Sequence, residues 1–252
     1  RSTPIKSSAA SDVYKRQLEN YITMNRLKYI LLLFLMLSPA KFYGQYFKKL
    51  TMKDGLSSPS VLAIYQDTLG RMWFGTNEGV NVYDSKQISK YKSYDIIDYQ
   101  HRRKNLINGV VNQIIGDSNG DILMLNSGAL IKYDIRKERF KELVPVGVGA
   151  LAALDGEIWC TVRDTLFRYD TDTDSLCFYR KLDVASVMCM EMSDRKIWIG
   201  TASGLYVMEG EEVKCVLPDI EIYKLFVSSR KELWIASRMQ GLYKAVSYTH
   251  LT

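Results

Sequence analysis

The side chains best suited to chemistry in this 252-residue chain are aromatic rings and guanidinium groups that stand between short apolar segments. Several of them fall in the longest polar connection, residues 91–106, and others occupy shorter loops. Aromatic rings offer flat surfaces for stacking, and the planar fork of an arginine donates several hydrogen bonds at once. This combination is suited to binding a sugar. The candidate ligand-binding residues are Asn77, Tyr94, Tyr99, His101, Arg102, Arg103, Arg163 and Arg238.

Patterns typical of catalysis or metal binding are not evident. No nucleophile–base pair, phosphate loop or His/Cys cluster stands out, and His101 is the one histidine outside the C-terminal segment 246–252. Asp170, Asp172 and Asp174 have the spacing that opens a calcium loop, but the glycine and glutamate required at positions six and twelve are missing. The sequence therefore predicts no catalytic residue, no metal site and no cofactor, and a solvated turn at 170–174.

The elements that must position these residues belong to a repeat. A phrase centred on Trp73 returns around Trp159, Trp198 and Trp234, and a degenerate copy without tryptophan surrounds Leu123. The spacing of about 36 to 50 residues is typical of propeller blades or solenoid repeats. Each copy reads as four short runs rich in β-branched and aromatic residues, separated by Gly, Asp, Asn and Ser turns. We predict an all-β fold, a β-propeller of four-stranded antiparallel blades with about five blades present.

The tryptophans have a structural interpretation. A large aromatic at a fixed place in each blade packs between neighbouring blades more readily than it stacks on a ligand, because aromatic side chains dominate core burial. We therefore predict that Trp73, Trp159, Trp198 and Trp234 are structural anchors at equivalent buried positions.

The topology of such a blade gathers the candidate binding residues. In a four-stranded meander, the loop between the second and third strands shares a face with the connection to the next blade. Asn77, Arg163, Arg238 and the connection 91–106 are therefore predicted on one face. Binding residues concentrate on loops held by a rigid scaffold. The alternative, that 91–106 is only a solvated loop, remains open.

Three phrases of the first repeat resemble a known family. They are Asp54–Ser58 (DGLSS), Ile64–Asp67 (IYQD) and Gly70–Val80 (GRMWFGTNEGV). They are similar to the two-component regulator propeller repeat, and the likeness extends over about residues 50 to 245. It is specific in the first repeat and in 196–206, fair around Trp234 and Trp159, and poor at 121–130.

The resemblance implies a periplasmic ligand sensor from a hybrid two-component histidine kinase, many of which sense oligosaccharides. In such a parent, a later membrane helix, a kinase and DNA-binding domains would control transcription, and the full sensor could form a homodimer. None of these further domains is in this sequence. Five blades could close a ring, but the resemblance and the adapter-like terminus favour a piece of a larger one, so we expect an incomplete ring. The alternatives are a secreted propeller lyase or hydrolase, which would need converging carboxylates, histidines or metal ligands, and a scaffold for protein contacts.

The two ends of the sequence differ in character from the repeats between them. Segments 1–23 and 246–252 look like translated adapter sequence and are excluded from fold reasoning. Residues 24–44 read as a signal peptide, with a basic start, a short apolar run, and cleavage after Ala40 or Gly44. An uncleaved anchor is the rival interpretation, although the apolar run is short for a bilayer. The propeller repeats are predicted over 45–245, in the periplasm.

Charge and cysteine content add two exclusions. The net charge is +6, but residues 1–44 contribute +5 of it, so the body is near neutral and gives no reason to expect nucleic acid. Cys160, Cys177, Cys189 and Cys215 lack metal-type spacing and are predicted to be buried free thiols.

Overall fold

The computed structural model describes residues 8–37, 47–91, 96–97, 103–104, 109–184, 186–247 and 250–251, divided into the units Arg1–Lys49 and Leu50–Thr252. The first unit holds the helix α1 (Ser8–Leu37), which runs across the predicted boundary between 1–23 and 24–44. Among the described residues, no helix has both the length and the apolar character needed to cross a membrane. Both predicted cleavage positions lie outside the described residues.

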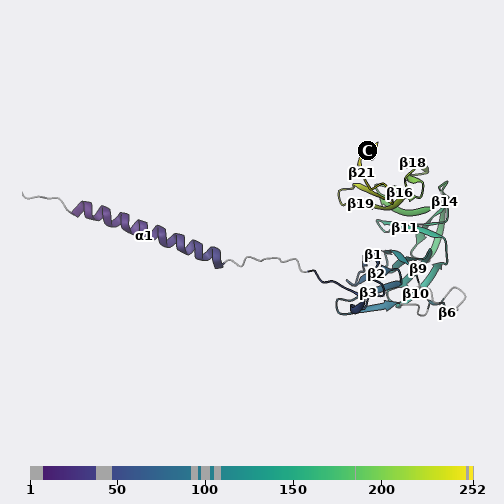
Figure 1. Ribbon diagram of the computed structural model, residues 1–252, viewed down its shortest axis with the longest axis horizontal. Coiled ribbons are helices and arrows are strands. Elements are labelled where there is room, and N and C mark those ends of the chain that lie inside the picture. The colour runs from purple at the N-terminus through teal and green to yellow at the C-terminus, as the bar shows by residue number, and fades with distance from the viewer. Residues whose placement is uncertain are drawn as a thin grey trace, which may run out of the picture. The chain divides into compact units, whose positions relative to one another are not determined.

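The described part of the second unit forms five four-stranded antiparallel sheets, which confirms the predicted all-β propeller (Figure 1). Each sheet is a meander in which consecutive strands pair, and we call the sheets blades one to five in chain order. A short 3-10 helix, η1 (Met52–Asp54), precedes blade one, and the small hairpin β5 (Ile96–Ile97) and β6 (Arg103–Lys104) follows it.

Blade one contains β1 (Val61–Gln66), β2 (Met72–Thr76), β3 (Gly79–Tyr83) and β4 (Ile88–Tyr91). Blade two contains β7 (Val111–Gly116), β8 (Ile122–Asn126), β9 (Ala129–Asp134) and β10 (Arg139–Val144). Blade three contains β11 (Val148–Leu154), β12 (Glu157–Val162), β13 (Thr165–Asp170) and β14 (Ser175–Lys181). Blade four contains β15 (Val187–Ser193), β16 (Lys196–Thr201), β17 (Gly204–Glu209) and β18 (Glu212–Pro218). Blade five contains β19 (Ile222–Val227), β20 (Leu233–Ser237), β21 (Leu242–Ser247) and β22 (His250–Leu251).

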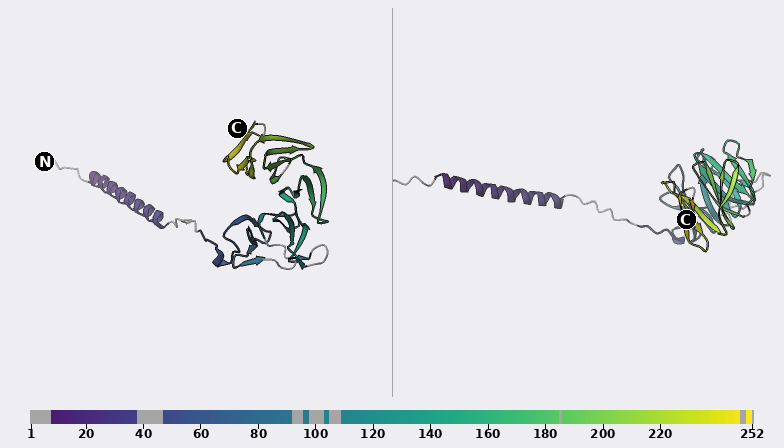
Figure 2. Two further views of the ribbon diagram at one scale, coloured as in Figure 1. Left: turned by 45° about the vertical axis from the view of Figure 1, so that its right-hand side comes forward. Right: turned by 90° about the horizontal axis from the view of Figure 1, so that it is seen from above.

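The five blades follow one another along an arc (Figure 2). The first strands of neighbouring blades pack against each other, from β1 through β7, β11 and β15 to β19. No sheet of the described residues joins blade five to blade one, so hydrogen bonds do not close the ring. The outer strand of blade five, β22, lies in the segment 246–252 and pairs with β21.

Tryptophans fill the space between one blade and the next. Trp73 is fully buried among aromatic side chains of blades one and two, with the Tyr133 ring centroid 4.9 Å away. Trp159 and Trp198 are also buried, and each packs toward the following blade. Trp234 in blade five is half-buried, because no described blade lies beyond it.

Glycines allow neighbouring blades to approach. A Cβ on Gly75 would lie 2.4 Å from the carbonyl oxygen of Val111, and one on Gly200 would lie 2.6 Å from Cγ2 of Ile222. Each of these partners belongs to the first strand of the next blade. The glycine two residues after the tryptophan therefore sets the contact distance between blades.

Two of the cysteines differ from the prediction. All four are free, and Cys160 and Cys189 are buried as expected, but Cys177 and Cys215 are exposed. Both exposed thiols lie on outermost strands, β14 and β18, which have no further strand beside them.

Candidate functional site

One face of the blades is held together by a recurring pair of backbone hydrogen bonds. The loop between the second and third strands donates to the connection before its own blade, as from Arg163 to Gly147 at 2.7 Å. The same loop is bonded to the connection that follows its blade, as where Leu182 donates to Asp164 at 2.6 Å. We call this side the connection face. Equivalent bonds join Ser127 to Val110, Val148 to Gly128, Ala202 to Ser186, Asp219 to Ser203, Gly79 to Gly109, and Arg238 to Glu221.

Three of the sequence-predicted residues lie in loops of the connection face. Asn77 lies between β2 and β3, Arg163 between β12 and β13, and Arg238 between β20 and β21. The Arg238 guanidinium is 3.3 Å from the Glu221 carboxylate, and both groups are accessible to solvent. Arg103 is the first residue of the strand β6. Tyr94, Tyr99, His101 and Arg102 lie outside the described residues.

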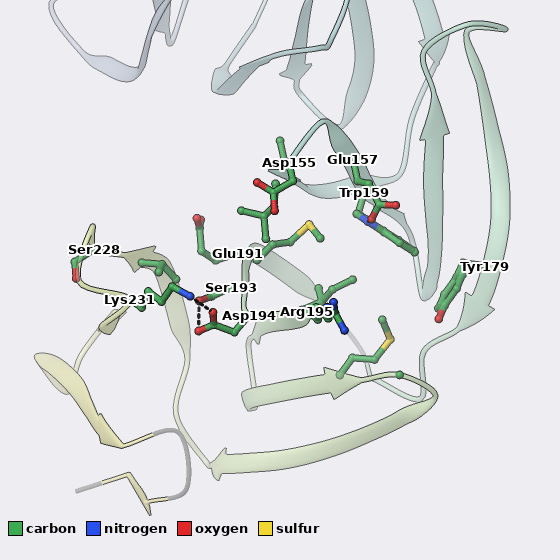
Figure 3. A pocket seen from close by; sticks show the side chains of 17 residues that line it. Asp155, Glu157, Trp159, Tyr179, Glu191, Ser193, Asp194, Arg195, Ser228 and Lys231 are labelled. Atoms are coloured by element: carbon green, nitrogen blue, oxygen red, sulfur yellow. Dashed lines mark hydrogen bonds and ion pairs between the residues drawn. The ribbon is translucent and has the colours of Figure 1, made fainter.

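A cavity lined by described residues opens on the opposite side, which we call the turn face because it carries the turns between first and second strands. Its volume is about 970 Å³, and it spans blades three, four and five (Figure 3). Its wall includes Asp155 from the turn of blade three, Asp194 and Arg195 from the turn of blade four, and Ser228 and Lys231 from that of blade five. Of the sequence-predicted residues, the repeat anchor Trp159 lines it, and none of the described candidate ligand-binding residues does.

Turn length accounts for the position of the cavity. In blade one, the turn begins at Asp67, whose side chain accepts hydrogen bonds from the backbone of Leu69 and Arg71. Asp117 has the same role in blade two. Blades three and four instead have two-residue turns with positive φ at both positions, at Asp155–Gly156 and Asp194–Arg195. The shorter turns leave the edge of the interface between blades uncovered.

An aromatic pair forms one wall of the cavity. The Tyr179 ring stands edge-on to Trp159, with centroids 4.8 Å apart and planes at 90°. The Trp159 indole Nε1 donates to the Glu157 carboxylate at 3.4 Å. Tyr179 is 42% exposed, so its ring is available to a ligand from the cavity side.

Charged groups form the rest of the rim above an apolar floor. Lys231 of blade five donates to Asp194 of blade four at 2.5 Å, and this ion pair ties the two blades together at the rim (Figure 3). Glu191 reaches the cavity from β15, and burial raises the pKa of its carboxyl while the charge of Lys224 opposes the rise. The floor includes Met192 and Ile197, which are buried.

The sequence did not predict this cavity, because the prediction was based on aromatic and arginine side chains in the loops. The usable signal was the difference in turn length between repeats. Blade one has Asp67–Arg71 between its first two strands, whereas blade three has only Asp155–Gly156.

The segment before β1 is anchored to blade one by buried hydrogen bonds. The Ser57 backbone N–H and hydroxyl each lie 2.9 Å from Oδ1 of Asn81, and the same hydroxyl is 3.0 Å from that of Thr76. These contacts give Ser57, Thr76 and Asn81 of the first repeat a structural role. Residues 55–78 match the model of the family described as two component regulator propeller. The chain carries a two-component regulator propeller repeat.

One curated protein is similar to this chain in sequence, and two solved structures share its fold. Histidine kinase P4 of Formosa agariphila is 43% identical over 47 residues, which are 19% of this chain and 3% of that protein. The extracellular domain of a B. thetaiotaomicron protein named as a hybrid two component system has a TM-score of 0.68 and 20% identity, over 81% of this chain and 31% of that chain. A second B. thetaiotaomicron extracellular domain, named as a one component system, has a TM-score of 0.64 and 18% identity, over 79% and 28%.

These comparisons establish the fold and the repeat. The chain spans less than a third of either solved extracellular domain, and its match covers a small part of the kinase. The body shares its propeller architecture with extracellular domains of regulatory systems, as the sequence resemblance predicted.

Proposed function

We propose that this chain is the ligand-sensing propeller part of an extracytoplasmic two-component sensor, and that its ligand is an oligosaccharide. The regulator propeller repeat at residues 55–78 is the observation that carries the proposal. The full parent would pass the binding event to a histidine kinase, and so to transcription. Binding would act through different affinities for two arrangements of the sensor, because a ligand that binds both equally shifts nothing.

We place the proposed oligosaccharide on the connection face. The loops carrying Asn77, Arg163 and Arg238 are held by backbone hydrogen bonds to the connections between blades, which gives a rigid support for binding groups. Tyr94, Tyr99, His101, Arg102 and Arg103 remain predicted members of the same site. Tyrosine rings would supply stacking area, and the guanidinium groups would donate several hydrogen bonds.

Substitutions on this face are expected to weaken oligosaccharide binding by the complete sensor. Arg102→Ala and Tyr94→Ala should each lower the affinity roughly tenfold, because each removes about 1–2 kcal/mol of hydrogen bonding or stacking. Titration calorimetry against a panel of polysaccharide fragments measures this. Arg136→Ala, at an exposed turn of blade two, is the matched control. Unchanged affinity in both variants would contradict the placement of the site.

Residues 24–44 are expected to export the protein. The basic start, the apolar run and the small residues near Ala40 are the features that a secretory leader needs. Fusion of this segment to a reporter active only outside the cytoplasm should give activity. A second fusion with Leu33 and Leu35 changed to Arg is the control and should be silent, because charges interrupt the apolar run. Reporter activity confined to the cytoplasm would refute the export signal.

A further inference from the structure

We propose that the turn-face cavity of blades three to five is a second saccharide site, selective for an uncharged mono- or disaccharide. The inference rests on the proposed function only in assuming that the protein meets saccharides. It assigns a different location and a different charge preference from the site on the connection face.

The size and lining of the cavity suit a small polyhydroxylated ligand. Its volume of about 970 Å³ lies within the range of about 300–1,000 Å³ typical of small-molecule sites. Met192 and Ile197 form a buried apolar floor, and polar side chains stand above it. A sugar ring has the same division, with C–H faces and hydroxyl edges.

Both parts of such a ring find partners in the wall. The Tyr179 ring is held edge-on against Trp159, so it offers a fixed apolar surface to a C–H face. The carboxylates of Glu191 and Asp155 also line the cavity, apart from the Tyr179 ring in Figure 3, where they can accept hydrogen bonds from hydroxyl groups. Hydrogen bonds to a charged acceptor are the stronger kind.

The charges of the rim disfavour an acidic ligand. Four carboxylates line the cavity against two cationic groups, and the ion pair between Lys231 and Asp194 removes one of each, which leaves three carboxylates against Arg195. A uronate or a sulfated sugar would bring its negative charge close to these carboxylates, at a cost in like-charge repulsion. The connection face, with its predicted arginines, has the opposite bias. The two sites are therefore separable by the charge of the ligand.

Titration calorimetry on the whole chain tests the proposal. The probes are methyl glycosides of glucose, galactose, mannose, xylose and arabinose, their β-linked disaccharides, and the glucuronate and galacturonate counterparts. We expect at least one neutral probe to bind at least tenfold more tightly than its uronate. Tyr179→Ala should weaken that binding about three- to tenfold, and Glu191→Gln about tenfold. Tyr223→Ala and Glu212→Gln, exposed and outside the cavity lining, are matched controls and should bind as the unchanged protein does.

Each other outcome overturns the proposal. It fails if no neutral probe binds, if uronates bind equally well, or if Tyr179→Ala and Glu191→Gln leave the affinity unchanged. Arg163→Ala separates the two proposals. Loss of the neutral probe with Arg163→Ala alone would place that probe on the connection face and refute the cavity, whereas loss with the cavity variants alone supports the cavity and leaves the proposal for the connection face unchanged.

Discussion

Replacing Lys132 by methionine is expected to lower the free energy of unfolding by about 3–5 kcal/mol, the range for removing one partner of a buried ion pair. Lys132 lies on β9 and is only 5% exposed. Its Nζ is 2.7 Å from Asp174, 2.9 Å from Asp121 and 3.5 Å from Asp117. Asp174 belongs to blade three, so this cluster also joins two blades.

The loss is large because the carboxylates would stay behind. Burial by itself lowers the pKa of Lys132, but hydrogen bonds to Asp174 and Asp121 outweigh burial and raise it above its ordinary value. Burial likewise raises the pKa of Asp174, and its hydrogen bonds from Lys132, Lys141 and Tyr169 reverse this and lower it. Without the ammonium group, three acidic side chains would face one another with little water between them.

Urea unfolding followed by tryptophan fluorescence measures the change. Lys141→Met is the matched control: it removes an exposed partner of Asp174, 2.8 Å away, and should cost less than about 1 kcal/mol. Adding Asp174→Asn to Lys132→Met should recover part of the loss by removing one stranded charge. A loss below about 1 kcal/mol for Lys132→Met would show that the cluster does not stabilise the fold.

The contacts of Lys132 with Asp117, Asp121 and Asp174 could not be predicted from the sequence. Asp170–Asp174 was expected to be a solvated turn, and this is wrong for Asp174, which binds a lysine 42 residues away in another blade. In blade one, Trp73 pairs with Val82 across the sheet, whereas in blade two Leu123 pairs with Lys132. The smaller leucine leaves room beside Asp117, and the lysine reaches it much as the tryptophan indole reaches Asp67. That exchange depends on contacts between strands and blades, which no single repeat reveals.

The parts that could be predicted are those that each repeat determines for itself. Short apolar runs between Gly and Asp turns predicted four strands in each repeat, and the repeat around Trp73 forms the four strands β1 to β4. The meander then required the loops carrying Asn77 and Arg163 to share a face with the connections between blades. The turn-face cavity was not predicted, because it lies where two turns are short and no type of side chain indicates its presence.

Replacing Asp67 by alanine is expected to lower the free energy of unfolding by about 2–4 kcal/mol, since one buried donor and three partly buried ones would lose their acceptor together. Asp67 is 5% exposed. It accepts hydrogen bonds from the Trp73 indole at 2.8 Å, from the Arg71 guanidinium at 2.7 Å, and from the backbone N–H groups of Leu69 and Arg71. One carboxylate therefore holds the turn, the arginine and the tryptophan between blades one and two.

The pH dependence of this effect distinguishes a charged contact from simple packing. Burial by itself raises the pKa of Asp67, but hydrogen bonds from Trp73 and Arg71 outweigh burial and bring the pKa below its ordinary value of 3.8. A group whose pKa is lower in the folded state contributes stability above its unfolded pKa of about 4, and that contribution is lost as the pH falls further through the folded pKa. The difference in stability between the unchanged protein and Asp67→Ala should therefore be larger at pH 7 than at pH 3.

Asp84→Ala is the matched control. Asp84 caps a turn by accepting hydrogen bonds from two backbone N–H groups, but it is exposed. Water can therefore replace its carboxylate, and the cost in stability should stay below about 1 kcal/mol. An equal difference at both pH values would mean that Asp67 acts by its shape, and a difference near zero at pH 7 would show that the tryptophan is held by its neighbours alone.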